Sequence, residues 1–354
     1  MANIKKLKEN TVKLVKLEDV CYNGSSSLSQ KDIIMLDGKY PVYGASGLIK
    51  YINFYKYDKE YIAIVKDGAG IGRTMILPAN SSVISTLQYI FPKENINIRY
   101  LYYALNAMDL SKYYSGVTIP HIYFKDYKKE ELYLPIIDEQ INIVNKLDKI
   151  REIIDIRKKQ IEELDEIIKS QFVEMFGDIK SNDKNWKTKN GSELFIFSSG
   201  KSNKTSNLSS NFEYKCYGGN GITGLSKDYL IDYDTIVIGR VGAYCGSVHT
   251  TEGKVWITDN AIYIKEFKED YNIKFLKELF EVIDFHRFAN FSGQPKITQQ
   301  PLQNYSYILP PIELQNQFAD IVKQIDKQKF EIQKSLEEMQ KLQESLMNKY
   351  FGEY

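Results

Sequence analysis

The sequence has few of the residues that build metal sites and disulfides. Its three cysteines, Cys21, Cys216 and Cys245, form no Cys-x-x-Cys pair and no zinc-like spacing with histidine. This argues against a zinc site and favours a reducing compartment. No run of about 18 apolar residues occurs, and the opening MANIKKLKEN is too polar for a signal peptide. We therefore expect a cytoplasmic protein.

Motifs of catalysis and cofactor binding are also missing. The stretches GASG (44–47) and GGNG (218–221) are not followed by the Lys-Ser or Lys-Thr of a P-loop, and no helix is expected to open at GAGIG (68–72) as a dinucleotide site requires. No Pro-Asp dipeptide of a nuclease occurs, and LPPI lacks the flanking residues of an amino-methyltransferase motif. The three histidines, His121, His249 and His286, lie in unlike contexts. We expect no catalytic site, metal or cofactor on this chain.

A strong net charge is missing as well. The formal net charge is +1, which taken alone argues against nucleic acid as a ligand. The charges are unevenly distributed, because residues 1–137 carry a net +5, 138–176 a net −3, 177–312 a net +1 and 313–354 a net −2. This pattern permits DNA binding without demonstrating it.

What the sequence does contain is an internal repeat. A shift of 174 residues aligns YPVYGASG, which begins at Tyr40, with YKCYGGNG, which begins at Tyr214. The same shift aligns IAIVKDGAGIGR with IVIGRVGAYCGS, so that Lys66 meets Arg240. Further on, ISTLQYIF aligns with ITDNAIYI at a shift of 173, and LPIIDEQ aligns with LPPIELQ at 175. The loops between the matched glycines are dissimilar, which predicts one scaffold that carries two different surfaces.

Each copy is predicted to be an α+β domain followed by a long helix. Short apolar strands alternate with Gly-, Ser- and Asn-rich turns and precede a short helix. Apolar residues then recur with a period of 3.5, which is typical of a coiled coil. The predicted order is a globular domain at 1–137, a helix at 138–176, a second domain at 177–312 and a second helix at 313–354. A helix of this length would be a spacer of about 58 Å.

The predicted coiled-coil seam is formed by Leu147, Ile150, Ile154, Ile161, Leu164, Ile168, Val322, Ile325, Ile332, Leu336, Met339 and Leu346. Arg157 and Lys329 interrupt the seam in different heptads. Their aliphatic stems can lie along apolar surface, but the two charges restrict the partner and the register that the seam accepts.

The doubled arrangement resembles the specificity subunit of type I restriction-modification systems. Three pairs of motifs carry the resemblance: YPVYGASG with YKCYGGNG, ELYLPIIDEQ with YILPPIELQ, and IIKSQFVEMFGD with SLMNKYFG. They occur in the family's order and cover essentially the whole chain. The resemblance implies two α/β target recognition domains that alternate with two conserved helices, and these helices are expected to pair as an antiparallel coiled coil.

The resemblance also implies a function. The chain would be a non-catalytic DNA-binding subunit whose two domains read the halves of a split, asymmetric site in double-stranded DNA. Its helices would dock two modification subunits, which are adenine-N6 methyltransferases, and restriction subunits could join the complex. The methyl donor S-adenosylmethionine and ATP would bind to those partners. The resemblance implies that such a complex would serve DNA methylation and phage defence.

Site residues follow from the family positions: the Gly-rich turn, the basic strand and loop, and the segment before the Leu-Pro motif. In the first domain these are Tyr43, Ser46, Lys66, Arg73, Thr86, Gln88, His121 and Lys125. In the second they are Tyr217, Asn220, Arg240, Tyr244, Asp259, Gln294, Lys296 and Gln299. Lys66 and Arg240 rank first because both copies keep a cation there, although a structural ion pair explains a cation equally well. For every single residue a solvated surface position is the alternative.

Two other functions stay open from the sequence. A coiled-coil scaffold that presents two protein-binding domains would have the same order of domains and helices. It would differ from a DNA-recognition subunit in showing no binding to duplex DNA, even with its partner present. An enzyme with an unrecognised site is the third hypothesis, and turnover by the chain alone would support it.

Overall fold

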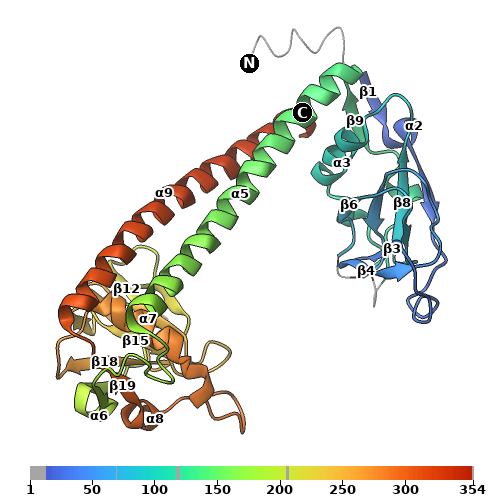
Figure 1. The fold of residues 1–354 in the computed structure, drawn as a ribbon. Coiled ribbons are helices and arrows are strands. Elements are labelled where there is room, and N and C mark those ends of the chain that lie inside the picture. The colour runs from blue at the N-terminus through green and yellow to red at the C-terminus, as the bar shows by residue number, and fades with distance from the viewer. Residues whose placement is uncertain (1–12, 69, 117–119, 205–206, 353–354) are drawn as a thin grey trace. The chain divides into compact units, whose positions relative to one another are not determined.

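The computed structural model describes residues 13–68, 70–116, 120–204 and 207–352. The first twelve residues of the predicted first domain and the last two of the predicted second helix lie outside the described residues. The chain divides into two compact units, Met1–Lys158 with Lys334–Tyr354 and Lys159–Gln333. Figure 1 shows that the division falls within two long helices, so each unit holds a globular domain and a part of each helix. Within the described ranges, no helix combines the length and the apolar character that crossing a bilayer requires.

The globular domain of the first unit is built from short elements. They are β1 (Lys13–Lys16), α2 (Leu17–Val20), β2 (Cys21–Ser25), β3 (Tyr40–Gly44), β4 (Gly47–Ile52), β5 (Tyr61–Val65), β6 (Thr74–Leu77), β7 (Ser82–Val83), β8 (Leu87–Pro92), α3 (Ile98–Ala107), the 3-10 helix η1 (Leu110–Tyr113), α4 (Phe124–Tyr127) and β9 (Glu131–Leu134). One sheet has the order β2-β8-β5-β6, a second has the order β4-β3-β7, and β1 pairs with β9. The first of these sheets is antiparallel, whereas β7 joins β3 in parallel.

The second unit repeats this domain. Its elements are β10 (Thr188–Asn190), α6 (Gly191–Leu194), β11 (Phe195–Ser199), β12 (Tyr214–Gly218), β13 (Gly221–Ser226), β14 (Ile231–Asp232), β15 (Ile236–Gly239), β16 (Val248–Thr250), β17 (Lys254–Ile257), β18 (Ala261–Phe267), α7 (Ile273–Ile283), the 3-10 helix η3 (Phe285–Phe288), α8 (Gln299–Asn304) and β19 (Ser306–Ile308). The sheets have the orders β11-β18-β15-β16, β13-β12-β17-β14 and β10-β19. The α+β fold class and its duplication are confirmed.

Main-chain hydrogen bonds test the predicted alignment residue by residue. The shift of 173 over ISTLQYIF is wrong, because Lys66 N donates to Thr86 O at 3.0 Å and Arg240 N donates to Asn260 O at 2.9 Å. Thr86 is therefore equivalent to Asn260 at a shift of 174, and not to Asp259. The sequence misled because ISTL and ITDN both begin with isoleucine and a hydroxyl residue, whereas strand register decides which residues are equivalent.

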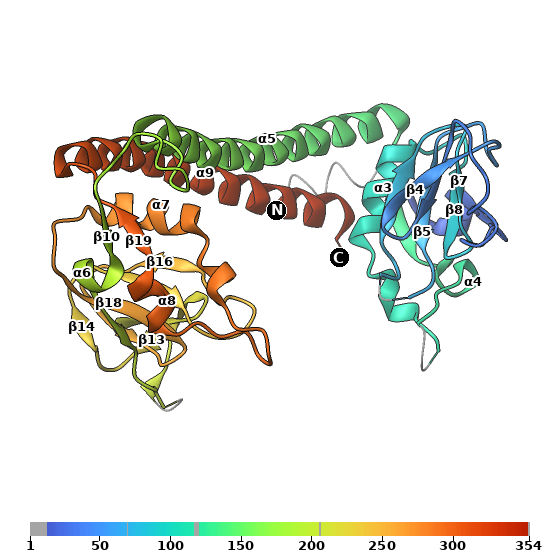
Figure 2. The ribbon, with the colours of Figure 1, turned by 60° about the horizontal axis from the view of Figure 1, so that its bottom comes forward.

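The long helices are α5 (Ile137–Phe176) and α9 (Ile312–Phe351), and Figure 2 shows them side by side. The beginning of α5 belongs with the end of α9 in the first unit, and the end of α5 belongs with the beginning of α9 in the second. The helices therefore pair in antiparallel fashion. All the predicted seam residues are buried or half-buried, and Lys329 forms an ion pair with Asp165 of the other helix.

A buried glutamine fixes the start of each long helix. Gln140 is fully buried, and its Oε1 accepts a hydrogen bond from Asn97 N at 2.8 Å, just before α3. Its Nε2 donates to Pro135 O at 2.8 Å. Gln315 is equally buried and makes the same contacts with Asn272 N and Pro310 O. The LPIIDEQ and LPPIELQ motifs are thus equivalent joints between a domain and a helix.

Each domain packs its longer helix against the ends of α5 and α9. In the second unit Phe172 of α5 lies 5.5 Å from Phe318 of α9 and 5.7 Å from Phe275 of α7, measured between ring centres. In the first unit Tyr100 of α3 lies 5.1 Å from Phe351 of α9. The apolar faces of the long helices are therefore part of the domain cores, and the domains are anchored on them.

Candidate nucleic-acid interface

The Gly-rich turn of the first domain connects β3 to β4 through Ala45 and Ser46. Gly47, which follows, has a φ of 106°, and this left-handed conformation favours glycine. Arg73 donates from its guanidinium to Ala45 O at 3.3 Å, which places the loop after β5 beside the turn. Ser46 and Arg73 are both exposed, so two predicted contact residues share one surface.

Lys66 and His121 meet around a carboxylate. Lys66 Nζ lies 2.7 Å from Asp67 Oδ2, and His121 Nδ1 lies 2.6 Å from Asp67 Oδ1. Burial works to raise the pKa of Asp67, but the hydrogen bonds from Lys66 and His121 outweigh it and hold that pKa below its usual value. Lys66 therefore does take part in an ion pair, which offsets part of its charge. All three side chains remain partly exposed.

In the second domain the turn between β12 and β13 also lies beside the strand that carries the matching cation. Ser247 Oγ donates to Gly219 O at 2.6 Å, and Arg240 donates from Nη1 to Asp259 O at 3.3 Å. Asn220 and Asp259 are exposed and Arg240 is half-buried. Among the described residues Arg240 forms no ion pair, unlike Lys66 in the first domain.

A further loop completes this surface. Gly242 N donates to Pro295 O at 2.9 Å, and Lys296 forms an isolated β-bridge with Val241, the residue after Arg240. Tyr244, Gln294 and Lys296 are exposed. The structure therefore brings together Asn220, Arg240, Tyr244, Asp259, Gln294 and Lys296.

Two predicted contact residues lie in the interior. Gln88 is 4% exposed and its Nε2 donates to the Tyr127 hydroxyl, because β8 is an inner strand that is covered on both faces. Tyr217 is 5% exposed on β12, which is also an inner strand. We leave Gln88 and Tyr217 out of the proposed contact set and assign them to the core.

Three more predicted residues are partly enclosed. Thr86 and Tyr43 are half-buried, and the Thr86 hydroxyl is buried without a hydrogen-bond partner among the described residues. Gln299 lies against β11: with its amide nitrogen toward Phe197 O, it donates there at 3.0 Å and accepts from Ser199 N at 3.2 Å. Gln299 thus stabilises a strand edge and is not available as a free amide.

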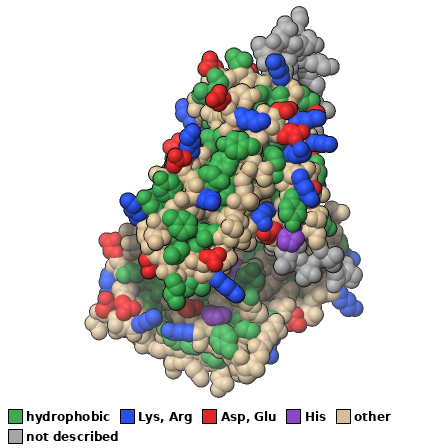
Figure 3. Space-filling view, turned by 90° about the vertical axis from the view of Figure 1, so that its right-hand side faces the viewer, with side chains coloured by type: hydrophobic (Ala, Val, Ile, Leu, Met, Phe, Trp, Pro, Cys, Tyr) green, Lys and Arg blue, Asp and Glu red, His purple; other side chains and the backbone are tan. Residues whose placement is uncertain are grey.

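Sequence reasoning also missed residues. Lys125 contributes to a cavity of about 610 Å³ in the first domain together with Lys93, Lys128, Tyr22 and Tyr123, none of which was predicted. The sequence did contain a signal for a difference between the two copies here, since the shift of 175 aligns Lys125 and Lys128 with glutamines of the second copy. Figure 3 shows lysine and arginine side chains intermixed with acidic, hydrophobic and other side chains on the face turned to the viewer.

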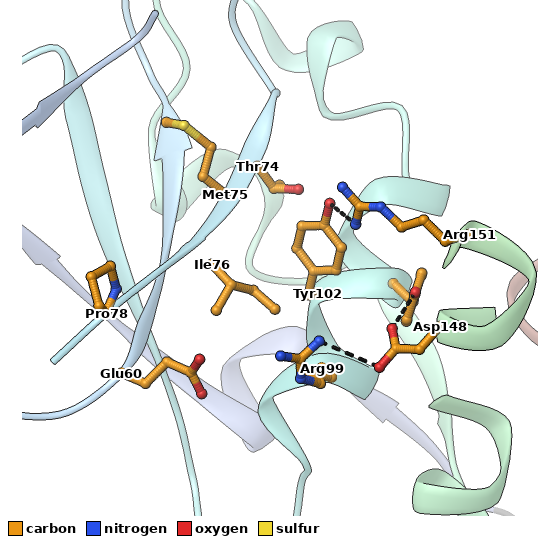
Figure 4. Close-up of a pocket in the computed structure, with 10 residues that line it drawn as sticks. Glu60, Thr74, Met75, Ile76, Pro78, Arg99, Tyr102, Asp148 and Arg151 are labelled. Carbon is orange, nitrogen blue, oxygen red and sulfur yellow. Dashed lines mark hydrogen bonds and ion pairs between the residues drawn. The ribbon is translucent and has the colours of Figure 1, made fainter. Parts of the chain in front are cut away.

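A second cavity, of about 490 Å³, lies where the first domain meets α5. Figure 4 shows Arg99 directed at Asp148, with 3.3 Å between Nη1 and Oδ2, and Arg151 directed at Tyr102, with 3.2 Å between Nη1 and the hydroxyl. Tyr103 donates to Asp148 Oδ1 at 2.6 Å. These polar groups are one another's hydrogen-bond and ion-pair partners, and they connect α3 of the first domain to α5. The described residues include no cluster of three or more His, Cys, Asp or Glu side chains that could hold a metal ion.

The two domains share their main-chain geometry but expose different polar groups. This arrangement is that of a two-domain recognition protein, and the described residues show no catalytic centre. The model of the type I restriction modification DNA specificity domain matches the chain twice, over residues 9–166 and 183–342. The chain belongs to this family of specificity subunits, and the resemblance seen in the sequence is confirmed.

One curated relative agrees with this assignment, and two solved structures share the fold. The specificity subunit of the type I restriction enzyme EcoprrI from Escherichia coli is 32% identical over 113 residues, which are 32% of this chain and 28% of that protein. The chain thus spans under a third of this curated relative. The crystal structure of the S subunit of a type I restriction-modification system from M. genitalium matches with a TM-score of 0.70 and 18% identity, over 98% of each chain. A structure described for complex assembly and conformational transition of the type I R-M system matches with a TM-score of 0.56 and 15% identity, over 97% of this chain and 98% of that one.

Proposed function

We propose that this chain reads a split, asymmetric site in duplex DNA, one half with each domain. The observation that carries the proposal is the set of equivalent positions with different polar side chains on one scaffold. Lys66 and Arg240 directly follow the equivalent strands β5 and β15, and Ser46 of the first Gly-rich turn is replaced by Asn220 in the second. Because each type of base edge in the major groove needs its own donors and acceptors, unlike side chains at equivalent positions suit unlike half-sites.

We further propose that the long helices dock two modification subunits, which are adenine-N6 methyltransferases. Apolar side chains on the outside of the helices support this: Ile156 of α5 is 48% exposed, and Phe330 and Leu342 of α9 are 67% and 43% exposed. A partner that covers these side chains would remove their apolar surface from water, which stabilises a complex. In this proposal S-adenosylmethionine and, where restriction subunits join, ATP bind to the partners, this chain has no catalysis of its own, and the complex works in the cytoplasm.

Single-molecule methylation sequencing tests the proposal directly. The chain is co-expressed with the methyltransferase proposed as its partner, and cells that express the methyltransferase alone are the control. We expect adenine marks at one bipartite motif only when both proteins are present. Association of the two proteins without marks at a bipartite motif would contradict the proposal and would favour the protein-binding scaffold.

A further inference from the structure

The lysine-lined cavity of the first domain has the composition of an anion site. It lies between the edge strand β2 and the segment around α4. Its cationic side chains are Lys66, Lys93, Lys125 and Lys128, and Glu18 is the single carboxylate among the described residues that line it. Tyr22 and Tyr123 flank the cavity and are 55% and 43% exposed. A large solvent-facing aromatic surface thus accompanies an excess of positive charge.

Two of these charges are not offset by carboxylates. Lys128 Nζ lies 2.7 Å from Glu18 Oε2, so these two side chains compensate each other. Lys93 Nζ donates to the main-chain carbonyl of Glu18 at 2.7 Å, and a carbonyl leaves the ammonium charge in place. Lys125 is exposed and lies 5.4 Å from the ring centre of Tyr123, with no ion pair among the described residues. Lys93 and Lys125 are therefore the cations that remain to bind an anion.

The second domain keeps the equivalent of Lys93 but not that of Lys125. Lys268 is equivalent to Lys93, because its Nζ donates to Ser192 O at 2.7 Å as Lys93 Nζ donates to Glu18 O. A shift of 175 residues takes Lys125 to Gln300 and Lys128 to Gln303. It takes Phe124 to Gln299, the side chain that lies against the main chain of β11. In the second domain, β11 is the equivalent of the edge strand β2, and a neutral amide lies against it. The net charges of +5 for residues 1–137 and +1 for residues 177–312 agree with this difference.

We propose that the cavity binds the sugar-phosphate backbone of DNA, and that Lys125 supplies a phosphate contact that the equivalent Gln300 of the second domain does not. This inference rests on the proposed function as a DNA-recognition subunit. Lysine suits the task because its ammonium is a compact charge on a flexible stem that holds phosphate without reading sequence. The tyrosine rings provide apolar surface for the deoxyribose beside each phosphate.

The salt dependence of binding tests the proposal. The complex of the full chain with its methyltransferase is titrated with a fluorescein-labelled duplex of mixed sequence at several KCl concentrations. Each lost phosphate contact lowers the slope of log K against log salt by about 0.9. We expect Lys93→Gln combined with Lys125→Gln to lower the magnitude of the slope by about 1.8. Lys129→Gln is the matched control, because Lys129 is exposed on the same segment and does not line the cavity.

Reciprocal variants and a competing anion separate the outcomes. Gln300→Lys combined with Gln303→Lys is expected to increase the slope, and circular dichroism verifies the fold of every variant. A slope in K93Q/K125Q equal to that of K129Q would overturn the proposal. If inorganic phosphate raises the melting temperature of the unmodified protein but not of K93Q/K125Q, and the DNA slope is unchanged, the cavity is a small-anion site and the proposal fails. Failure of the proposed function is distinct, because the unmodified complex would then direct no methylation to a bipartite motif.

Discussion

Replacing Gln315 with alanine tests the joint between α9 and the second domain. The Gln315 side chain is fully buried, accepts from Asn272 N at 3.0 Å and donates to Pro310 O at 2.9 Å. Alanine leaves this N–H and this C=O without their partner, and an unsatisfied buried group costs about 1–3 kcal/mol. Asn272 N is only partly buried and can regain water. We therefore expect the free energy of unfolding of the second unit to fall by about 2–4 kcal/mol.

The position of the tryptophans makes the assay specific for one unit. Trp186 and Trp256 are the only tryptophans of the chain, and both belong to the second unit. Urea unfolding followed by tryptophan emission therefore reports on the second unit, whereas far-ultraviolet circular dichroism reports on both. Gln315→Ala is expected to move the emission midpoint to lower urea. Gln140→Ala, which breaks the equivalent joint in the first unit, is expected to change the dichroism curve and to leave the emission midpoint in place.

The matched control is Gln317→Ala, which makes the same chemical change at an exposed position of the same helix. Its emission midpoint is expected to equal that of the unmodified protein. If Gln315→Ala and Gln317→Ala unfold at the same urea concentration, the hydrogen bonds of Gln315 do not stabilise the joint and our reasoning is refuted.

Two further predictions concern charge. Arg240→Ala is expected to weaken binding to the mapped DNA site by about 1–3 kcal/mol. Lys66→Ala is expected to weaken it by less, because Asp67 already offsets the Lys66 charge. Fluorescence titration of the labelled site measures both losses, and equal losses would contradict this role of Asp67. Burial and the nearby Glu281 raise the pKa of Glu278 from near 4.5 to about 7. Between these two pH values the folded second unit keeps a proton on Glu278 that the unfolded chain releases. Its stabilising contribution is present below about pH 4.5 and is lost as the pH rises through about 7. Glu278→Gln is expected to flatten the dependence of the urea midpoint on pH between 5 and 8 as followed by tryptophan emission, and an unchanged dependence would show that other groups cause it.

The fold could be predicted because its determinants are written twice in the sequence. The turn glycines, the apolar strands and the long apolar seam each recur at a nearly constant shift, and the structure confirms the α+β domains and the paired helices. The charge of Lys329 in the apolar seam is also accounted for, because Lys329 forms an ion pair with Asp165 of the other helix. The local shift of 173 failed because similarity of residue type carries no information on strand register.

The candidate site could be predicted only in part. The Gly-rich turns and the cations beside them lie together, as at Ser46 with Arg73, because the turn glycines fix the backbone there. Gln88 was predicted as a contact residue but lies in the core, because a polar residue type does not reveal that its strand is covered on both faces. The pairing of Lys66 with Asp67 was open from the sequence, since only side-chain rotamers decide whether neighbouring charges meet. Two of the cavity lysines, Lys93 and Lys128, were missed because the cavity is lined from separate segments, and no local pattern joins Lys93 to Lys125.

The end of α9 has a consequence for the order in which the protein is made. Leu346, Met347 and Tyr350 pack against the core of the first domain, although they are among the last described residues to leave the ribosome. The second unit consists of the single continuous stretch Lys159–Gln333. Because domains fold as they emerge, the second unit can close while the first still exposes the apolar surface that α9 will cover. The domain that is synthesised first is therefore the one that is completed last.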